Sequence, residues 1–419
     1  MIGSLFAGIS GLNVNATAMT VIGDNIANVN TTGYKSNRAS FANIMNQSLE
    51  GVDTNGIGRG VEFWGTTPLW SQGSIENTSN PTDMAINGRG FFTLRDDTGS
   101  TLYSRAGDFS FDRDGYLINP DGLFAQGYQV SAVNPDGTLV LGTIMDINVP
   151  GQSTTPPSQT TEITVDVNLD AGEAVGQTYL TTMIAYDSLG NAIPISITFE
   201  KMAVNQWDAT ASVPAGTLQT GPPAGTIAIS DNSFTFLGNG ALQDAAVGDP
   251  QIQITGLGSG AADMNIVWDV FDDTTLATNG DLTQYAGPSM TTFQTQDGYS
   301  AGTLRGVSVD EYGVVNGAYS NGQITPLYQV VLTDFPNQSG LSKMGNNLYA
   351  ESRNSGQAMP GMAQSGRLGS ISPSAIEMSN VDLAQEFVKM ITTQRAFQAN
   401  SRVITTSDEI LAELINIKR

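Results

Sequence analysis

The sequence predicts a mainly β protein with a long α-helix at each end, and three observations lead to this prediction. Apolar residues recur every seven positions near both ends, which is typical of helices that pair along one face. Between the ends, short apolar runs alternate with turns rich in Gly, Asn and Pro, which is typical of β-strands. An acidic block interrupts this β region and indicates a discontinuous, nested multidomain architecture.

Composition excludes several classes of function. The chain has 419 residues, enough for two or three domains, and 17 basic against 40 acidic residues give a net charge of −23. Such a charge disfavours binding to nucleic acid or to anionic lipid. The absence of Cys and His removes thiol nucleophiles, imidazole bases, disulfides and the usual zinc or haem ligands. We therefore expect no enzyme activity, no catalytic, cofactor-binding or metal-binding residues and no nucleic-acid partner.

The first predicted element is a helix of 26 residues, and we expect its apolar seam to be buried in an assembly. Its polar face consists of Ser, Asn and Thr, and several glycines, each costing ~1 kcal/mol in a helix, make it weak in isolation. Both facts favour a helix surrounded by protein. Neither a basic leader nor an unbroken apolar run of about 18 residues is present, so we expect neither a cleaved signal peptide nor membrane insertion. The seam comprises Ile2, Leu5, Ile9, Leu12, Ala16, Met19, Gly23 and Ile26.

The last predicted element is a second long helix, with a plausible capping box formed by Ser379 and Asp382. The alternative for both ends is an ordinary amphipathic helix that lies on its own domain. The glycines and the uncharged polar face of the first helix favour burial in an assembly instead. The apolar residues expected at the second assembly seam are Leu383, Phe387, Met390, Phe397, Ile404, Leu411 and Ile415.

The middle of the chain is predicted to form antiparallel sheets. Strand-like runs lie at 90–94, 161–167, 193–199, 252–255 and 327–332, and NPDG turns begin at Asn119 and Asn134. Residues 151–300 hold 16 acids and one base, which indicates an exposed, inserted domain. The predicted division has four parts. Residues 1–34 with 374–419 form a terminal helical domain, and residues 35–74 form a connecting segment. Residues 75–150 with 297–373 form a β-rich middle domain, and residues 151–296 form an acidic β-rich outer domain.

Two motifs that could bind ligands are weak. Residues 112–115, DRDG, resemble the start of a calcium loop, but Tyr116 and Leu123 occupy positions where acidic ligands are needed. Residues 56–60, GIGRG, lack the spacing of a dinucleotide-binding loop. We interpret the first as a turn and the second as a loop.

The most specific pattern follows the first helix, where residues 27–35 run ANVNTTGYK. Asn and Gly accept the left-handed geometry of a helix end, and Asn and Thr can satisfy the freed backbone groups. This segment resembles the signature of the bacterial flagellar rod and hook family. So do DMAINGRGFF at 83–92, YSRAGDF at 103–109, SNVDLA at 379–384 and QRAFQANS at 394–401. The motif residues singled out are Asn28, Asn30, Thr31, Gly33 and Tyr34.

Within that family the chain resembles the hook members in particular. The rod members lack a large insertion, whereas here the acidic block is followed by QDGY at 296–299, YSNG at 319–322 and FPN at 335–337. The resemblance implies a structural subunit that stacks head to tail into a hollow, bendable tube, a universal joint between motor and filament. It also implies export by the flagellar type III apparatus without a cleaved signal, and an extracellular position in the hook and basal body. Implied partners are other copies, the distal rod, the hook cap and the hook-filament junction proteins.

Two alternatives remain open at this point. One is a distal rod protein with an unusual insertion, which would form a straight tube. The other is a secreted β-rich adhesin or glycan-degrading enzyme, which could share the Gly, Thr and Asn content of residues 75–370 but would not need two terminal heptad helices.

Overall fold

The chain forms two compact units in the computed structural model, which describes residues 2–44, 60–134, 136–220, 224–243, 248–271 and 278–417. The GIGRG segment at 56–60 lies outside the described residues except for Gly60. Unit 1 comprises Met1–Gly151, Gly306–Ala318 and Ile324–Arg419, and it contains both chain ends. Unit 2 comprises Gln152–Arg305 and Tyr319–Gln323 and holds the acidic block.

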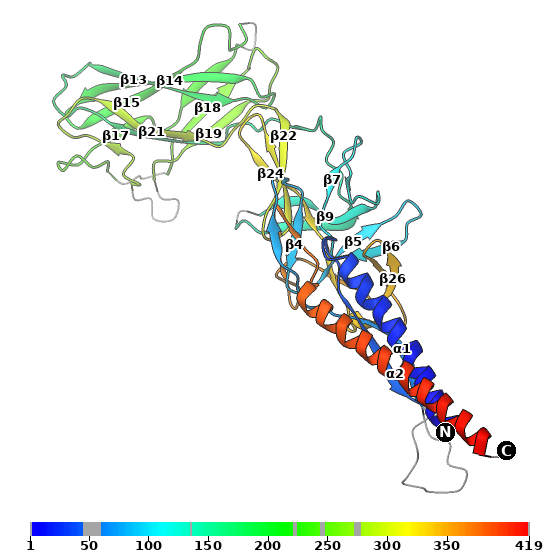
Figure 1. Ribbon diagram of the computed structural model, residues 1–419. Helices are drawn as coiled ribbons and strands as arrows, with labels where there is room; N and C mark the ends of the chain where they lie inside the picture. Colours follow the sequence, from blue (N-terminus) through cyan, green and yellow to red (C-terminus); the bar gives the residue numbers. More distant parts are fainter. Residues whose placement is uncertain are drawn as a thin grey trace. The chain divides into compact units, whose positions relative to one another are not determined.

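Both predicted terminal helices are confirmed. Helix α1 spans Ile2–Ala27 and helix α2 spans Leu383–Ile417, and the two lie side by side within unit 1 (Figure 1). The predicted capping box at Ser379 is wrong, because α2 begins later. Asp382 is the N-cap instead, and its Oδ1 accepts hydrogen bonds from Ala384 N at 2.9 Å and Gln385 N at 3.2 Å.

Helix α1 is long and apolar enough, by length and composition alone, to cross a membrane. Its residues Gly3–Ala27 reach a mean hydropathy of 1.4. The criterion of an unbroken apolar run is therefore too strict to exclude a span. The core helix of a soluble protein meets the same description, and here α1 packs against α2 and against the hairpin formed by β1 (Asn37–Asn43) and β2 (Val61–Pro68).

Unit 1 joins strands from opposite ends of the chain. The antiparallel pairs β3 (Ile75–Asn77) with β30 (Ala375–Glu377) and β4 (Met84–Asn87) with β29 (Ser370–Pro373) hold the segment before α2 against the residues that follow β2. The main sheet of unit 1 follows the order β23 (Val314–Tyr319), β24 (Ile324–Val330), β9 (Phe124–Val133), β5 (Phe91–Arg95), β6 (Thr101–Ser104), β27 (Leu348–Ala350) and β26 (Ser342–Gly345). Attached to it are β7 (Ser110–Phe111), β8 (Leu117–Ile118), β10 (Leu139–Asp146), β25 (Leu332–Asp334) and β28 (Met359–Gly361).

An aromatic cluster forms part of the core of unit 1. Phe91, Tyr103, Phe335 and Tyr349 are buried and pack with edge-to-face contacts, and Trp70 joins them with its ring 5.2 Å from that of Phe91. Aromatic pairs of this geometry add about 0.5–1.5 kcal/mol each beyond burial. The cluster therefore stabilises the packing of β5, β6 and β27, which carry Phe91, Tyr103 and Tyr349.

Unit 2 is a two-layer β-sandwich. The alternating pattern of β14 places Ile193, Ile195, Ile197 and Phe199 in the same buried cluster as residues of the opposite sheet, which confirms the strands predicted at 161–167, 193–199 and 252–255. One sheet follows the order β16 (Thr226–Ile229), β18 (Gln251–Thr255), β19 (Met264–Trp268), β12 (Glu162–Asn168) and β20 (Leu282–Thr283), with β21 (Met290–Gln296) also paired to β12. The other follows the order β13 (Thr178–Tyr186), β14 (Ala192–Ala203), β15 (Gln206–Ser212) and β17 (Ser233–Thr235).

The prediction of purely antiparallel sheets is wrong for unit 2. Strand β12 pairs in parallel with both β19 and β20. The reason is connectivity, because the chain leaves β12 to build most of the second sheet and returns in the same direction. Composition and periodicity are local properties, so they do not indicate that the chain crosses to the second sheet and returns.

The chain enters and leaves unit 2 at adjacent points. Thr154 of β11 (Thr154–Thr155) pairs with Thr303 of β22 (Gly302–Val309). Ser158 and Tyr299 exchange two backbone hydrogen bonds of 3.0 Å. The two ends of the insertion are thus held together by β-pairing, so an excision here would leave ends that a short linker can join.

Candidate functional site

The candidate site is the place where the two chain ends meet. We define the terminal junction as residues 28–37 after α1, residues 69–73, Arg105, and residues 377–386 around the start of α2. It adjoins the contact between the two helices, which is described first.

The helices approach closely at two glycines of α1. A Cβ built on Gly8 would lie 3.0 Å from Ile404 Cγ1, and one on Gly11 would lie 2.7 Å from Asn400 Nδ2. Small residues at such a contact let two helix backbones come near one another. Towards the C-terminal end of α1 the same face continues with Val14, Ala18 and Ile22, which are 7–8% exposed.

The predicted seam of α1 lies mostly beside this contact. Leu5, Leu12, Met19, Gly23 and Ile26 are half-buried, whereas Ile9 and Ala16 are exposed; the side chain of Ile2 is outside the described set. The helices pair as predicted, but α1 uses a face of 3.6-residue period centred on its small residues. The heptad pattern therefore does not locate the intramolecular contact. The role of the seam in contacts between copies stays a prediction.

The predicted seam of α2 likewise contains both half-buried and exposed residues. Met390, Phe397, Ile404 and Leu411 are half-buried, while the side chain of Ile415 is outside the described set. Leu383 is 40% exposed and Phe387 is 49% exposed. Further apolar side chains are exposed on α2, namely Val388, Ile391, Val403 and Ile410.

The motif after α1 ends the helix and turns the chain into the β region. Asn28 donates from its side chain to Asp24 O at 2.9 Å and accepts a hydrogen bond from the Thr31 hydroxyl at 3.1 Å. Gly33 has φ +68°, and a Cβ there would lie 2.5 Å from the backbone nitrogen of Ala106. Only glycine meets both requirements. Asn30, in contrast, is exposed.

Tyr34 connects the end of α1 to the hairpin. Its hydroxyl donates to Asp24 Oδ2 at 3.0 Å and accepts from Asn37 Nδ2 at 3.1 Å. Burial, together with the nearby Asp24 carboxylate, raises the pKa of Tyr34, so the phenol remains a donor at any ordinary pH. Asn25, which is 1% exposed, exchanges two 2.8 Å hydrogen bonds with the backbone of Asn37 and donates to Glu386 Oε2 of α2 at 3.3 Å.

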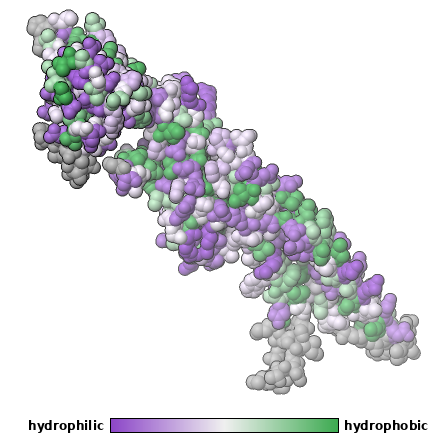
Figure 2. Space-filling model, turned by 90° about the vertical axis from the view of Figure 1, so that its left-hand side faces the viewer, coloured by the Kyte–Doolittle hydropathy of each residue, from purple (hydrophilic) through white to green (hydrophobic). Residues whose placement is uncertain are grey.

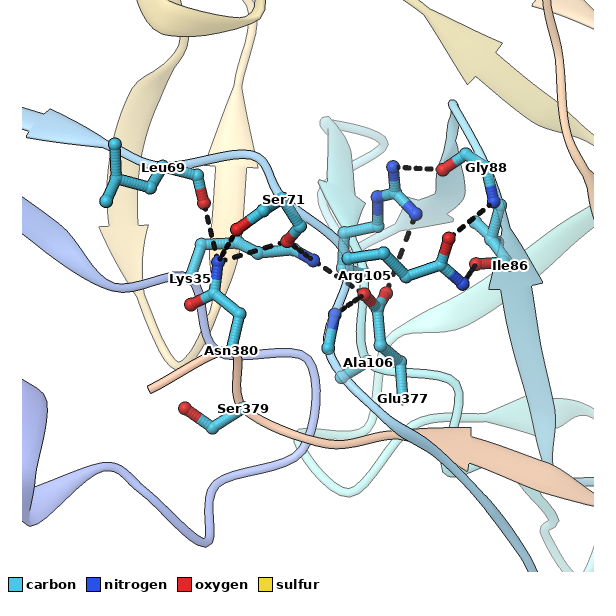
Figure 3. A network of polar contacts seen from close by, with 12 residues as sticks. Lys35, Leu69, Ser71, Ile86, Gly88, Arg105, Ala106, Glu377, Ser379 and Asn380 are labelled. Atoms are coloured by element: carbon cyan, nitrogen blue, oxygen red, sulfur yellow. Dashed lines mark hydrogen bonds and ion pairs between the residues drawn. The ribbon is translucent and has the colours of Figure 1, made fainter. Parts of the chain in front are cut away.

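A buried ion-pair cluster lies at the centre of the junction (Figure 3). Lys35 Nζ is 2.6 Å from Glu377 Oε1, and both side chains are fully buried. The Arg105 guanidinium, 3% exposed, lies 3.5 Å from Glu377 Oε2 and donates to Gly88 O at 2.7 Å. Glu377 also accepts from Gly73 N at 2.9 Å, and its backbone oxygen accepts from Gly33 N at 2.7 Å.

The charges of this cluster depend on one another. Burial lowers the pKa of Lys35 and that of Arg105, and the Glu377 carboxylate opposes the shift in both cases. Without Glu377, two cations would lie in a region that water does not reach, which is strongly unfavourable. Their pairing therefore requires strand β30 to be in place.

Asn380 completes the junction on the side of Lys35 that lies away from Arg105 (Figure 3). Its Oδ1 accepts from Ser36 N at 2.7 Å, and its Nδ2 donates to Leu69 O at 2.8 Å and Ser71 O at 3.0 Å. Lys35 Nζ donates to the same Ser71 oxygen at 3.0 Å. The side chain of Asn380 thus ties the start of α2 to two stretches of chain that lie more than 300 residues earlier in the sequence.

Sequence reasoning identified the motif but missed its partners. Lys35, Arg105 and Asn380 lie in recognised segments and Glu377 lies two residues before one, yet no role was predicted for any of them from the sequence. One signal was available for Lys35, because it is the first basic residue of the chain and sits next to the motif. Chemically the arrangement is a clamp: its charged and amide groups are used to tie strands and helices together.

The DRDG turn is confirmed as a turn. Asp112 Oδ1 accepts from Asp114 N at 2.9 Å and Tyr116 N at 2.8 Å, which uses the carboxylate to close the loop. Among the described residues there is no group of three or more acidic side chains placed to hold a metal ion.

Four models of flagellar protein families match successive parts of the chain. Family models match residues 5–35 ("Flagella basal body rod protein"), 85–168 ("Flagellar hook protein FlgE/F/G D1 domain"), 157–299 ("Flagellar basal body protein FlaE D2 domain") and 372–417 ("Flagellar basal body rod FlgEFG protein C-terminal").

Curated relatives extend over the full chain. The "Flagellar hook protein FlgE" of Treponema pallidum is 34% identical with 100% of each chain covered, and that of Escherichia coli is 33% identical with 98% of each covered. A crystal structure of Helicobacter pylori flagellar hook protein FlgE2 superimposes with a TM-score of 0.53 at 15% identity, covering 72% of this chain and 100% of that one. The last likeness supports the fold alone.

Proposed function

The chain belongs to the flagellar hook protein family, and from this premise we propose how its parts share the work of the polymer. Subunits of this family polymerise within the hook and basal body, as a hollow, bendable tube that transmits torque. Full-length similarity to hook proteins and a match of the insertion to the D2 model set aside the distal rod and adhesin alternatives.

We propose that the terminal helices form the inner layer of the tube and bind other copies through their outer apolar faces. The observation that carries this proposal is exposure. Within one chain, Phe6 of α1 is 61% exposed, and Phe387, Val388 and Ile391 of α2 are 49%, 61% and 50% exposed. Apolar side chains grouped in this way on helices are typical of surfaces that another protein covers. Figure 2 shows apolar residues on the surface of the helical part of unit 1.

The terminal junction would then pass load between the inner helices and the β-rich body. Buried ion pairs and multiple hydrogen bonds join α1, α2 and β30 there. The proposed domain division remains that of residues 1–34 with 374–419, 35–74, 75–150 with 297–373, and 151–296. In this division the acidic outer domain faces solvent, and wetter contacts between outer domains allow bending.

The direct test changes exposed residues that one chain does not need for its own fold. Val388→Ser and Ile391→Ser should leave the monomer's circular dichroism unchanged but prevent polymer formation, as measured by sedimentation and electron microscopy. Val204→Ser is the control, since Val204 is 83% exposed on unit 2 far from the helices in sequence. Polymers that form normally from both α2 variants would contradict the proposal.

A second experiment separates the roles of the two units. Deleting residues 151–296 and joining Pro150 to Asp297 through a flexible linker should yield tubes that assemble but differ in bending stiffness or curvature. Electron micrographs would measure the curvature. Complete loss of polymer from a deletion protein whose unit 1 is folded would count against this division of labour.

We also propose that the chain is exported by the flagellar type III apparatus without cleavage and acts outside the cell. Its further partners would be the distal rod, the hook cap and the hook-filament junction proteins. The absence of Cys supports this, because a chain that travels unfolded cannot depend on disulfides. The mass of the protein recovered from isolated hooks tests the proposal, and a shortened N-terminus would refute it.

A further inference from the structure

The hairpin of β1 and β2 contains an irregularity at the position of one large, exposed side chain. In its register Ser40 pairs with Gly65 and Phe41 pairs with Phe63, so Trp64 is the extra residue of a β-bulge. A bulge re-aims a side chain and is typical of functional positions. Trp64 is 79% exposed, which is unusual for the largest apolar side chain.

The other tryptophans show the contrast. Trp207 and Trp268 are 1% and 0% exposed in the core of unit 2, and Trp70 packs in the aromatic cluster of unit 1. Near Trp64 the hairpin exposes more apolar surface, since Phe41 is 46% exposed and Ile44 is 38% exposed. Among the residues that the structure describes, none covers this patch.

The strands that carry this patch pack against α1, one of the two helices proposed for assembly. Val61 at the start of β2 donates to Ser10 Oγ of α1 at 3.2 Å, and both strands pack against that helix. Phe6 and Ile9, which precede Ser10 in the same helix, are themselves exposed. A second copy bound to this part of α1 would therefore lie next to the hairpin.

We propose that Trp64 is an anchor residue through which the β1–β2 hairpin of one copy docks on a second copy in the polymer. This rests on the proposed function and deepens it. Tryptophan is enriched among the few residues that dominate interface energies, because it has a large area and few rotamers to immobilise. The contact joins unlike surfaces of the two copies, as a helical polymer requires.

The structure provides its own reporter for this contact. Because the other three tryptophans are buried or packed, quenching of fluorescence by iodide in the monomer should come mainly from Trp64 and should be absent in Trp64→Phe. Polymer formation by the wild-type chain should remove this quenching. The inference is overturned if the polymer is quenched as strongly as the monomer, or if the monomer shows no quenchable component.

Substitution gives an independent measurement. Trp64→Ser should raise the protein concentration needed for polymer formation by about 30-fold or more, the effect expected for an interface hot spot. Trp64→Phe should recover part of the loss, and Thr66→Ala, exposed on the same strand, should have almost no effect. An unchanged threshold for Trp64→Ser would refute the inference. If the wild-type chain itself forms no polymer, the proposed function fails first, and this inference fails with it.

Discussion

The buried ion-pair cluster permits a quantitative prediction for Glu377→Gln. The Glu377 carboxylate lies 2.6 Å from Lys35 Nζ and 3.5 Å from the Arg105 guanidinium, and none of these side chains is more than 3% exposed. Glutamine keeps the shape but removes the charge, which leaves two buried cations without their shared anion. Breaking a buried pair in this way costs about 3–5 kcal/mol. For a unit of this size, that corresponds to a fall in melting temperature of roughly 10 °C.

Differential scanning calorimetry of the full chain is the suitable assay, because the transition of unit 2 serves as an internal standard. Only the transition of unit 1 should move. Arg95→Met is the matched control within unit 1: Arg95 is 46% exposed, its partner Asp146 is 14% exposed and also accepts from Gln126, and a pair this close to solvent contributes at most about 1 kcal/mol.

The double variant Lys35→Met/Glu377→Gln tests the reasoning further. It removes one cation together with the anion, so it should cost less than the sum of the single variants. A loss below about 1 kcal/mol for Glu377→Gln, or strictly additive costs, would show that the cluster does not hold unit 1 together in the way described.

Three further predictions concern glycines and pH. Gly33→Ala should lower the melting temperature of unit 1 by several degrees, because φ is +68° and the new Cβ would lie 2.5 Å from Ala106 N. Gly11→Ala should push α2 away at Asn400 and weaken polymer formation, which sedimentation would measure, although alanine favours helix locally. The melting temperature of unit 2 should rise as pH falls from 7 to 5, since burial and the carboxylates of Asp166, Asp269 and Asp249 raise the pKa of Asp281 to about 6.

The sign of the pH effect follows from linkage. A carboxyl whose pKa is raised by folding binds its proton more tightly in the folded state, so it stabilises the fold at low pH, and that stability is lost as pH rises through about 6. Asp281→Asn should therefore flatten the dependence. For the glycines, Gly122→Ala and Gly3→Ala are controls, because a Cβ at either site meets nothing within 4 Å. Equal losses at Gly33 and Gly122, or at Gly11 and Gly3, would mean that steric contact is not the cause.

The sequence was sufficient to predict the elements, because their periodicity is local. Both terminal helices and the buried strands of the sandwich follow directly from patterns of seven and two residues. The motif after α1 was also visible, since Gly33 and Asn28 are residue types with a defined role at a helix end.

What could not be predicted depends on which distant segments meet. Lys35 and Glu377 are separated by 342 positions, and neither residue alone indicates a buried pair. The parallel pairing of β12 was missed for the same reason. The contact between the helices follows Gly8 and Gly11, because backbone proximity outweighs the size of the apolar side chains that suggested a heptad seam.

The separation of Lys35 from Glu377 has a consequence in time. A polypeptide made or delivered from its N-terminus presents Lys35 early, but the carboxylate that neutralises it arrives only after nine-tenths of the residues have emerged. Until Glu377 has emerged, Lys35 has no anion to pair with, so the terminal junction cannot form early. The order of emergence thus makes the last strand the step that commits each molecule to its final form.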